Sequence, residues 1–369
     1  MRNKDLRVKK VFSVTNSNGF TPSVDYFNKD VFSSDLSNYK IVRRGMLAYN
    51  PSRINVGSVA CLSTEDEVIV SPLYVVIKVD ETKLLPEYLD LFLHSSVVLQ
   101  QIRSLTSGSV RDSLKYTAFS RLCLPIPSIE IQKDVVKKLR IAKAAISTRN
   151  LQVKKIDQLA KSRFVEMFGD PIANSQKWNV EDLKSIITHA NNGMSRRGND
   201  ESGSVVLRLV ELQSGYLDYS NPNRIVLTEQ EKKRFQLKEN DFLFARVNGN
   251  PENVGRCAYF KGWQEPVYHN DHIIRVQFKA QIVSPEFLQH LLNSQYGRNE
   301  MRGKIKTSAG QYTINQEGIG SIRIPIPPLE LQNEFAAFIE QLDKSKVAVQ
   351  ESIRKLEILY KAKLQEYFG

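Results

Sequence analysis

Residues 323–335, RIPIPPLELQNEF, combine two isoleucine–proline steps with a glutamate and a glutamine that open a helical pattern. Proline lacks an N–H and biases the residue before it towards extended geometry, so the stretch predicts a strand-like segment that becomes helical only after its prolines. The glutamate then lies in the first helical turn, where a negative charge suits the positive end of the helix dipole. A near twin, LPIPSIEIQKDVV at residues 124–136, predicts the same transition earlier in the chain.

The two stretches belong to an internal repeat, which indicates a duplicated architecture. A shift of 200 residues aligns residues 125–169 with 325–369 without a gap. The globular blocks before these segments also echo each other, because PEYL at 86–89 resembles PEFL at 285–288. Each half is therefore expected to be a block followed by a helical segment, and the four predicted regions are 1–121, 122–169, 170–321 and 322–369.

Each helical segment carries an apolar seam with alternating four- and three-residue spacing, which is the heptad pattern of coiled coils. One polar residue interrupts each seam, Arg149 in the first copy and Lys346 in the second. A helix of about 38 residues spans about 57 Å. So long an apolar seam needs a partner, and we predict that the two helices pair as a two-stranded coiled coil. The alternative is that each helix packs on its own block. The apolar seam residues are Val135, Leu139, Ile146, Val153, Ile156, Phe335, Ile339, Leu342, Val349, Ile353 and Leu356.

The globular blocks mix β-rich runs with short helical patterns, so each is expected to be an α+β domain. Residues 68–79, VIVSPLYVVIKV, read as strands, whereas PEYL and PEFL open helices with proline in the first turn. The second block begins with residues 170–195, for which the first block has no counterpart before Met1. We expect that the first block either begins differently or lacks a segment of about thirty residues by this alignment.

Composition favours a cytoplasmic protein with a polyanionic partner. The chain has no run of eighteen apolar residues and no charged-then-apolar leader at Met1. Its three cysteines, Cys61, Cys123 and Cys257, lack C-x-x-C spacing, so we expect buried apolar side chains rather than zinc ligands or disulfides. The formal net charge of +12 favours a phosphate backbone, which basic surfaces bind through counterion release.

The sequence contains none of the common catalytic motifs. It has no P-loop, no H-E-x-x-H and no G-x-S-x-G, and its histidines show no metal-ligand spacing. Residues 45–53, GMLAYNPSR, superficially resemble the Asn-Pro-Pro-aromatic loop of adenine methyltransferases, but they lack the second proline and the aromatic residue. No glycine-rich turn is available after a strand to hold a methyl donor. We therefore expect no catalytic site, no metal and no cofactor in this chain.

Polar residues suited to nucleic acid occur in matching loops of the two blocks. Arg, Asn and Gln can read base edges with paired hydrogen bonds, and Ser, Thr and Tyr can hold phosphates. Taken singly, each fits a solvated turn better than a base contact, and the set carries more weight than its members. The candidates are Asn50, Ser52, Arg53, Asn55, Thr106, Ser107, Ser109, Arg111, Lys115, Ser195, Arg196, Arg197, Arg246, Asn248, Asn250, Asn253, Thr307, Ser308, Gln311 and Tyr312.

Taken together, the repeated I-P-I-P opening, the heptad helices that close in Phe-Gly, the MFGDP link and the YNPSRINVGS stretch resemble the specificity subunits of type I restriction-modification enzymes. The resemblance covers essentially the whole chain. It implies two target recognition domains that each read one half of a split double-stranded DNA sequence, with two helices that pair antiparallel and fix the distance between the half-sites.

The resemblance also implies partners. In that family two modification subunits dock on the specificity subunit and methylate adenine with S-adenosylmethionine, and restriction subunits add ATP- and Mg-dependent translocation and cleavage. The specificity subunit itself is not an enzyme. Because the two blocks diverge in sequence, a non-palindromic target is expected. The rival interpretation is a coiled-coil scaffold or dimerisation protein without DNA binding.

Overall fold

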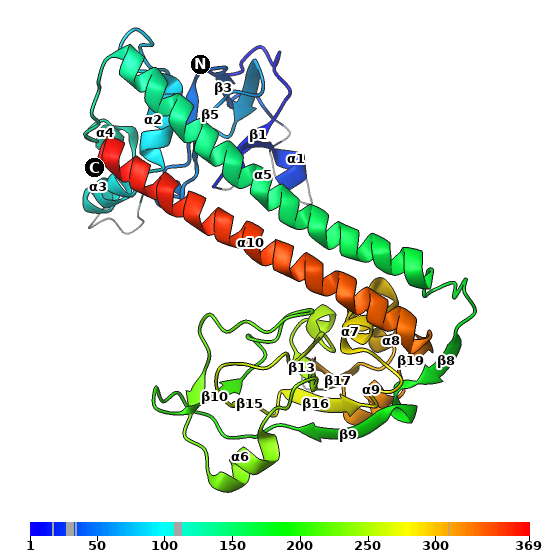
Figure 1. Ribbon diagram of the computed structural model, residues 1–369. Helices are drawn as coiled ribbons and strands as arrows, with labels where there is room; N and C mark the ends of the chain where they lie inside the picture. The colour runs from blue at the N-terminus through cyan, green and yellow to red at the C-terminus, as the bar shows by residue number, and fades with distance from the viewer. Residues whose placement is uncertain (17, 27–32, 34, 107–112, 309) are drawn as a thin grey trace. The chain divides into compact units, whose positions relative to one another are not determined.

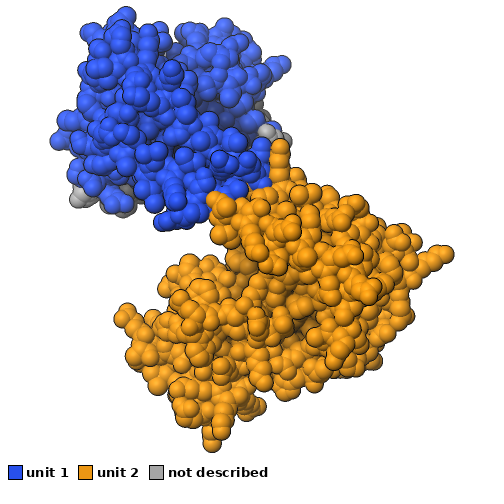
Figure 2. Space-filling model, in the orientation of Figure 1, with its two compact units in different colours: residues 1–152, 349–369 blue, residues 153–348 orange. Residues whose placement is uncertain are grey.

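The computed structural model describes residues 1–16, 18–26, 33, 35–106, 113–308 and 310–369. They form two compact units, which have different colours in Figure 2. Unit 1 combines Met1–Gln152 with Val349–Gly369, and unit 2 is Val153–Ala348. The boundaries fall inside the two longest helices, α5 (Ile129–Phe168) and α10 (Leu329–Phe368), so each unit contains part of both.

Unit 1 is built from short antiparallel sheets and small helices (Figure 1). Its described strands form a β1–β2 hairpin, a β3–β6 pair and a sheet in the order β5-β4-β7, with α2 packed against β5. Pro86 opens α2, as predicted, because the first turn does not use its missing N–H. The bounds are β1 Phe12–Thr15, β2 Gly19–Pro22, α1 Ser23–Tyr26, β3 Lys40–Arg43, β4 Leu47–Tyr49, η1 Ile54–Val56, β5 Val59–Cys61, β6 Glu67–Val70, β7 Val75–Ile77, α2 Pro86–Leu93, α3 Ser96–Thr106 and α4 Tyr116–Phe119.

Unit 2 contains a four-stranded antiparallel sheet in the order β14-β12-β16-β9. Smaller sheets have the orders β11-β10-β15, β13-β18-β17 and β19-β8, and β10 pairs with β15 in parallel. The bounds are β8 Asn179–Asp182, η2 Leu183–Ser185, β9 Ile187–Asn192, β10 Ser204–Leu207, β11 Arg224–Ile225, α6 Glu229–Phe235, β12 Phe242–Ala245, β13 Val247–Asn248, η3 Pro251–Asn253, β14 Cys257–Tyr259, β15 Val267–His269, β16 Ile273–Phe278, α7 Pro285–Asn293, α8 Gln295–Arg302, β17 Lys306–Ser308, β18 Gln311–Thr313, α9 Gln316–Gly320 and β19 Arg323–Ile326.

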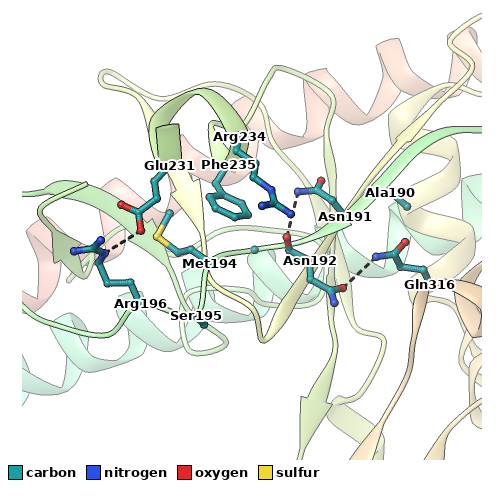
Figure 3. Close-up of a pocket in the computed structure, with 11 residues that line it drawn as sticks. Ala190, Asn191, Asn192, Met194, Ser195, Arg196, Glu231, Arg234, Phe235 and Gln316 are labelled. Atoms are coloured by element: carbon teal, nitrogen blue, oxygen red, sulfur yellow. Dashed lines mark hydrogen bonds and ion pairs between the residues drawn. The ribbon is translucent and has the colours of Figure 1, made fainter. Parts of the chain in front are cut away.

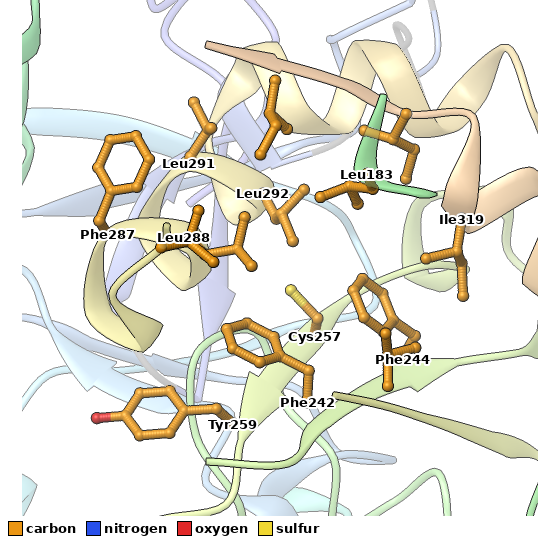
Figure 4. Packing of buried hydrophobic residues seen from close by; sticks show 14 of the residues in the cluster. Leu183, Phe242, Phe244, Cys257, Tyr259, Phe287, Leu288, Leu291, Leu292 and Ile319 are labelled. Atoms are coloured by element: carbon orange, nitrogen blue, oxygen red, sulfur yellow. The ribbon is translucent and has the colours of Figure 1, made fainter. Parts of the chain in front are cut away.

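Strand β12 is an inner strand of the four-stranded sheet, and all four of its side chains are buried. Successive side chains of a strand point to opposite faces. Phe242 and Phe244 accordingly pack in a cluster with the leucines of α7, whereas Leu243 and Ala245 join a second cluster. Figure 4 shows the first cluster, with α7 contributing Leu288 and its neighbours. The predicted α+β class is confirmed.

In each unit one end of α5 packs against the opposite end of α10. In unit 1, Val135 and Leu139 share a buried cluster with Leu364. In unit 2, the ring of Phe164 meets that of Phe335 edge-on with centroids 5.4 Å apart. Numbers rise along one helix as they fall along the other, so the pairing is antiparallel. Of the predicted apolar seam residues, Val135, Leu139, Phe335 and Ile339 are buried, and seven are partly buried: Ile146, Val153, Ile156, Leu342, Val349, Ile353 and Leu356. The polar seam residue Arg149 is exposed.

Each long helix ends in a phenylalanine that packs against the block it does not follow in sequence. Phe168 lies at the end of α5, and the centroid of its ring is 4.8 Å from that of Phe287 in the PEFL motif of α7. Phe368 lies at the end of α10, and the centroid of its ring is 5.1 Å from that of Tyr88 in the PEYL motif of α2. The predicted left-handed glycine follows the first of these helices, where Gly169 has a φ of +75°.

The glutamine of the opening stretch fastens the start of each long helix to its block. Gln332 is fully buried; its Oε1 accepts from the N–H of Ser284 at 2.8 Å, and its Nε2 donates to the carbonyls of Ile282 and Pro327 at 3.0 and 2.8 Å. Gln132 repeats this arrangement in unit 1. Its partners are the N–H of Leu85 and the carbonyls of Lys83 and Pro127, at 2.8, 2.8 and 2.9 Å.

The two copies of the proline-rich stretch differ in structure. In unit 2 it forms β19, which pairs with β8, so the predicted strand-like entry to the helix is confirmed there. In unit 1 residues 122–128 form no strand, because none of the described residues offers a partner strand equivalent to β8. The expectation that all three cysteines are buried is confirmed for Cys257 and wrong for Cys123, which is exposed, and Cys61 is only partly buried.

None of the helices in the described part of the chain is both long and apolar enough to cross a membrane.

Candidate nucleic-acid interface

Unit 2 has an open surface pocket of about 750 Å³ between the end of β9, the loop that follows it, α6 and the start of α9 (Figure 3). Two predicted residues, Ser195 and Arg196, line it. Gly193 lets the loop pass close to neighbouring backbone, since a Cβ there would lie 2.2 Å from the carbonyl oxygen of His269. The pocket wall therefore depends on a glycine.

The side chains of Asn191 and Asn192 form one wall of the pocket, and neighbouring side chains orient them through hydrogen bonds. Arg275, which is 8% exposed, donates from Nε to Oδ1 of Asn191 at 2.8 Å. Asn191 in turn donates from Nδ2 to the backbone carbonyl of Asn192 at 3.2 Å. Gln316 donates from Nε2 to Oδ1 of Asn192 at 3.3 Å, which connects α9 to the end of β9. These contacts give the amide groups fixed orientations.

Helix α6 forms the opposite wall and begins with a capping box. The hydroxyl of Thr228 accepts from the N–H of Glu231, and the Glu231 side chain accepts from the N–H of Thr228. The backbone bond from Thr228, followed by smaller effects of the Thr228 hydroxyl and Arg196, lowers the pKa of Glu231. Glu231 therefore stays ionised and pairs with Arg196 at 2.9 Å. A polyanion that uses Arg196 must compete with this carboxylate.

A second basic group lies on the same unit. Arg197 pairs with Asp271, with Nη2 and Oδ1 2.6 Å apart. Arg246 donates from Nη1 to the backbone carbonyl of the same Asp271 at 3.1 Å. The structure thus brings together two candidates, Arg197 and Arg246, that lie 49 positions apart in the sequence.

Three further candidates are cross-strand neighbours in the sheet β13-β18-β17. Tyr312 is paired with Asn248 on one side and with Thr307 on the other. Directly opposed side chains in an antiparallel sheet lie about 4.5–5.5 Å apart, so the three form a continuous polar row. Gln311, at the start of β18, is exposed.

Two candidate asparagines stabilise loop turns, and the repeat preserves this role. Oδ1 of Asn248 accepts from the N–H of Asn250 at 2.9 Å, and Oδ1 of Asn50 in unit 1 accepts from the N–H of Ser52 at 3.1 Å. Asn250 caps η3 through the N–H of Glu252. The side-chain oxygens of Asn50 and Asn248 thus accept hydrogen bonds within the turns. Within the described structure their side-chain Nδ2 groups donate no hydrogen bond.

Four of the described candidates of unit 1, Asn50, Arg53, Asn55 and Lys115, lie at or beside this turn. Asn50 and Arg53 line a small pocket of about 90 Å³ together with β1. Lys115 is exposed, and the preceding Leu114 donates its N–H to the carbonyl of Pro51 at 2.9 Å, which places Lys115 beside the turn. Asn55 is exposed as well.

The remaining candidates include residues outside the described part of the chain. Ser107, Ser109 and Arg111 lie outside the described residues, as do the side chains of Thr106 and Ser308. Asn253 lies at the end of η3 and is half-buried.

Sequence reasoning missed Asn191, Asn192, Arg234 and Gln316 as pocket residues. The T-x-x-E capping box before a KKR run was a local signal for a basic helix at this position. The chemistry that the pocket offers is hydrogen bonding by amides and guanidinium groups, and this suits base edges and phosphates. Across the described part of the chain, no group of three or more His, Cys, Asp or Glu side chains is arranged to hold a metal.

Residues 173–358, slightly more than half of the chain, match the family model described as the type I restriction modification DNA specificity domain. The chain belongs to this family of type I restriction-modification specificity subunits. A similar relative is the type I restriction enzyme StySPI specificity subunit of Salmonella potsdam, which is 29% identical over 270 residues. The match covers 70% of this chain but only 58% of that subunit's own length.

Two solved structures share the fold. One, described for the complex assembly and conformational transition of a type I R-M system, matches 90% of this chain and 84% of its own with a TM-score of 0.57 and 17% identity. The other is the type I restriction-modification S subunit of M. genitalium, which matches 92% of this chain and 87% of its own with a TM-score of 0.56 and 13% identity.

Proposed function

We propose that this chain is the DNA-reading subunit of a type I restriction-modification enzyme and that it recognises a bipartite, asymmetric site. Each unit reads one half of the site in double-stranded DNA, and the paired helices set the unread gap between the halves. The chain contributes recognition rather than catalysis.

One observation carries the proposal: the two units repeat one asparagine-stabilised turn but surround it with different side chains. The turn has the same hydrogen bond at Asn50 and at Asn248. Beside it, Arg53 of unit 1 is replaced by Pro251 of unit 2, and Lys115 by Asn315. Base-edge readers with different hydrogen-bonding groups select different sequences, so two diverged copies of one loop fit two different half-sites.

Basic residues supply the part of binding that does not depend on sequence. Arg196, Arg197 and Arg234 are exposed on unit 2, and the whole chain carries a formal net charge of +12. Phosphate contacts by such residues orient a reader on the duplex, while amides such as Asn191 and Gln316 face the pocket and suit base edges. Affinity is therefore expected to fall steeply with salt.

The proposed partners follow from the family. Two modification subunits bind the chain and methylate adenine with S-adenosylmethionine, and restriction subunits supply ATP- and Mg-dependent cleavage. The relative from Salmonella potsdam is named as a specificity subunit of a restriction enzyme, and one solved neighbour is described as part of a type I assembly. Both support a role within a larger complex.

A block exchange tests the proposal. Residues 170–321 are replaced by the equivalent block of another specificity subunit, and DNA from cells that also express the modification subunit is sequenced for methyladenine. We expect one half of the methylated motif to change while the other half is retained. A change in both halves would show that the two units do not read independently.

The rival function is a helical scaffold without DNA binding, which the long antiparallel helix pair also fits. Filter binding of the complex to duplex DNA across a salt series separates the two functions. A reader loses affinity as salt rises, whereas a scaffold shows no retention of DNA at any salt concentration.

A further inference from the structure

Gln316 and Asn192 form a pair of amide side chains in the lining of the unit 2 pocket (Figure 3). Both residues are exposed, and Nε2 of Gln316 donates to Oδ1 of Asn192 at 3.3 Å. An amide NH2 group carries two N–H donors, and an amide oxygen carries two lone pairs. Within the part of the chain that the structure describes, the Gln316 side chain makes no other hydrogen bond, so its oxygen and its second N–H are both available to a ligand.

The backbone on both sides of this amide pair is well supported. Asn192 ends β9 and is paired with Ile274 of β16, and the fully buried Ile319 anchors α9 in the core. The side chain of Asn315 caps α9 by accepting from the N–H of Gly318 at 2.8 Å. A side chain that is already oriented loses less conformational freedom when it binds, so the pair is preorganised for a ligand.

The Gln316 amide offers one acceptor and one donor side by side. In the major groove, adenine presents the complementary pair, which is the N6 donor and the N7 acceptor. Guanine presents two acceptors there, cytosine presents a donor, and thymine presents an acceptor and a methyl group. Adenine is therefore the base whose edge matches both groups of the amide at once.

The charges around Gln316 favour a base edge over a phosphate. The adjacent Glu317 is exposed, and its carboxylate repels a phosphate, whereas the neutral amide of Gln316 does not offset that repulsion. A phosphate fits better at the exposed Arg234, which belongs to α6 on the opposite wall of the pocket. This division separates a base-reading wall from a phosphate-binding wall.

The equivalent position of unit 1 holds a different side chain. The shift of 200 residues aligns Gln316 with Tyr116, and each is the first residue of a short helix, α9 in unit 2 and α4 in unit 1. Tyr116 is 60% exposed. A single hydroxyl group cannot form the paired contact of an amide. The position therefore diverges in the way expected of one that selects different bases in the two half-sites.

We propose that Gln316 recognises one adenine in the half-site read by unit 2, and that Asn192 is a positioning residue that orients the Gln316 amide. Oε1 of Gln316 accepts from the N6 amino group of the adenine, and Nε2 donates to N7. The inference rests on the DNA-reading function proposed above, and it names a base that this function leaves open.

A base analogue tests the contact at a single atom. The block exchange described above identifies the half-site read by unit 2, and each adenine of that half-site is then replaced in a duplex by 7-deazaadenine, which lacks the N7 acceptor. Competition binding uses the complex of this chain with its modification subunit. At one adenine the analogue should lower affinity by about tenfold or more. A complex with Gln316→Leu should bind the two duplexes within about twofold, because leucine makes no contact with N7.

Substitutions at the same position test the choice of base. A carboxylate accepts from N4 of cytosine, so Gln316→Glu should shift the ratio of affinities for adenine and cytosine duplexes towards cytosine by about tenfold or more. A ratio cancels the uniform repulsion between the added charge and DNA. The matched control is Glu317→Gln, an exposed neighbour on the same helix, which should change this ratio by less than about twofold.

Asn192 variants test the positioning role with the same ratio. Asn192→Ala removes the acceptor that orients Gln316, so the preference for adenine should fall, whereas Asn192→Asp keeps an acceptor and should restore it. Both residues are exposed, so the variants should keep their fold, and circular dichroism checks this. An unchanged preference in Asn192→Ala would show that Asn192 does not position the amide.

The outcomes separate this inference from the function on which it rests. If the complex binds its duplex but Gln316→Leu leaves the effect of 7-deazaadenine unchanged at every adenine, the assignment of Gln316 is wrong and the DNA-reading function stands. The same conclusion follows if Gln316→Glu keeps the preference for adenine. If the complex retains no duplex DNA at any salt concentration, the DNA-reading function fails and the assignment fails with it.

Discussion

At the scale of single residues, the two buried glutamines join each globular block to the long helix that follows it. Gln332 satisfies one backbone donor and two backbone acceptors, and it has no exposed surface. A buried backbone group left without a partner costs about 1–3 kcal/mol. We predict that Gln332→Leu, which leaves all three backbone groups without a hydrogen-bond partner, lowers the free energy of unfolding of unit 2 by about 3 kcal/mol or more.

Tryptophan fluorescence during urea unfolding measures this effect, because both tryptophans, Trp178 and Trp263, belong to unit 2. The matched control is Gln341→Leu, an exposed position on the same helix, which should change stability by less than about 0.5 kcal/mol. Equal effects of the two variants would exclude a special role for the buried amide.

The glutamine also shows where sequence reasoning stopped. The repeated E-x-Q predicted a first helical turn, and both long helices begin there. Two of the three partners of Gln332 are backbone groups about 50 positions earlier, at Ile282 and Ser284. No sequence pattern marks a distant backbone group as a hydrogen-bond partner. The pocket residue Asn191 escaped notice for the same reason, since it is oriented by a buried arginine from another strand.

His269 gives unit 2 a specific pH dependence. Burial, followed by the nearby Arg275, lowers the pKa of His269 to about 3. The unfolded chain regains the ordinary value of about 6.5, so between these pH values the unfolded state binds more protons. The contribution of His269 to stability is therefore complete above pH 6.5 and is lost as the pH falls, by about 1.4 kcal/mol for each pH unit.

Urea unfolding at several pH values between 7.5 and 5 checks this expectation. His269→Gln should flatten the decline relative to the native chain. Burial also lowers the pKa of His290, but that residue is present in both proteins and cancels in the comparison. Parallel curves for the two proteins would contradict a neutral, buried His269.

At the scale of elements, the ends of the long helices complete the cores of the units. Phe368 is 3% exposed and its ring lies against Tyr88 and Phe92 of α2, at 5.1 and 5.7 Å. Truncating a buried phenylalanine to alanine costs about 3–5 kcal/mol. We predict that Phe368→Ala raises hydrogen exchange in α2 of unit 1 and leaves α7 of unit 2 unchanged.

Phe168→Ala is the reciprocal control. Its ring packs against Phe287 of α7, so exchange should rise in unit 2 and stay constant in α2. If both variants raised hydrogen exchange in the same unit, the conclusion that each long helix ends in the core of the other block would be wrong.

Sequence patterns predicted both long helices and their pairing, because a heptad seam needs a partner whatever surrounds it. They did not predict that each helix finishes in the core of the other half. That arrangement depends on contacts between Phe168 and Phe287, 119 positions apart, and the spacing of apolar residues along one helix carries no record of its distant partners.

At the scale of the whole molecule, the paired helices are proposed to set the gap between the half-sites. Removing seven residues from the middle of α5 and the opposing seven from α10 keeps the heptad phase of both seams. It shortens the pair by about 10 Å, since a helix rises 1.5 Å per residue. DNA rises about 3.4 Å per base pair, so we predict a methylated motif with unchanged half-sites and a gap about three base pairs shorter.

Methylome sequencing of cells that express the shortened chain with its modification subunit measures the gap. Circular dichroism checks that the shortened chain is folded. If a folded chain gave no methylation at all, the partner subunits would tolerate only one spacing. A chain with seven residues added to each helix should then also give no methylation. If the gap between the half-sites stayed the same after both helices were shortened, the helices would not set that gap, and another element of the chain would have to fix it.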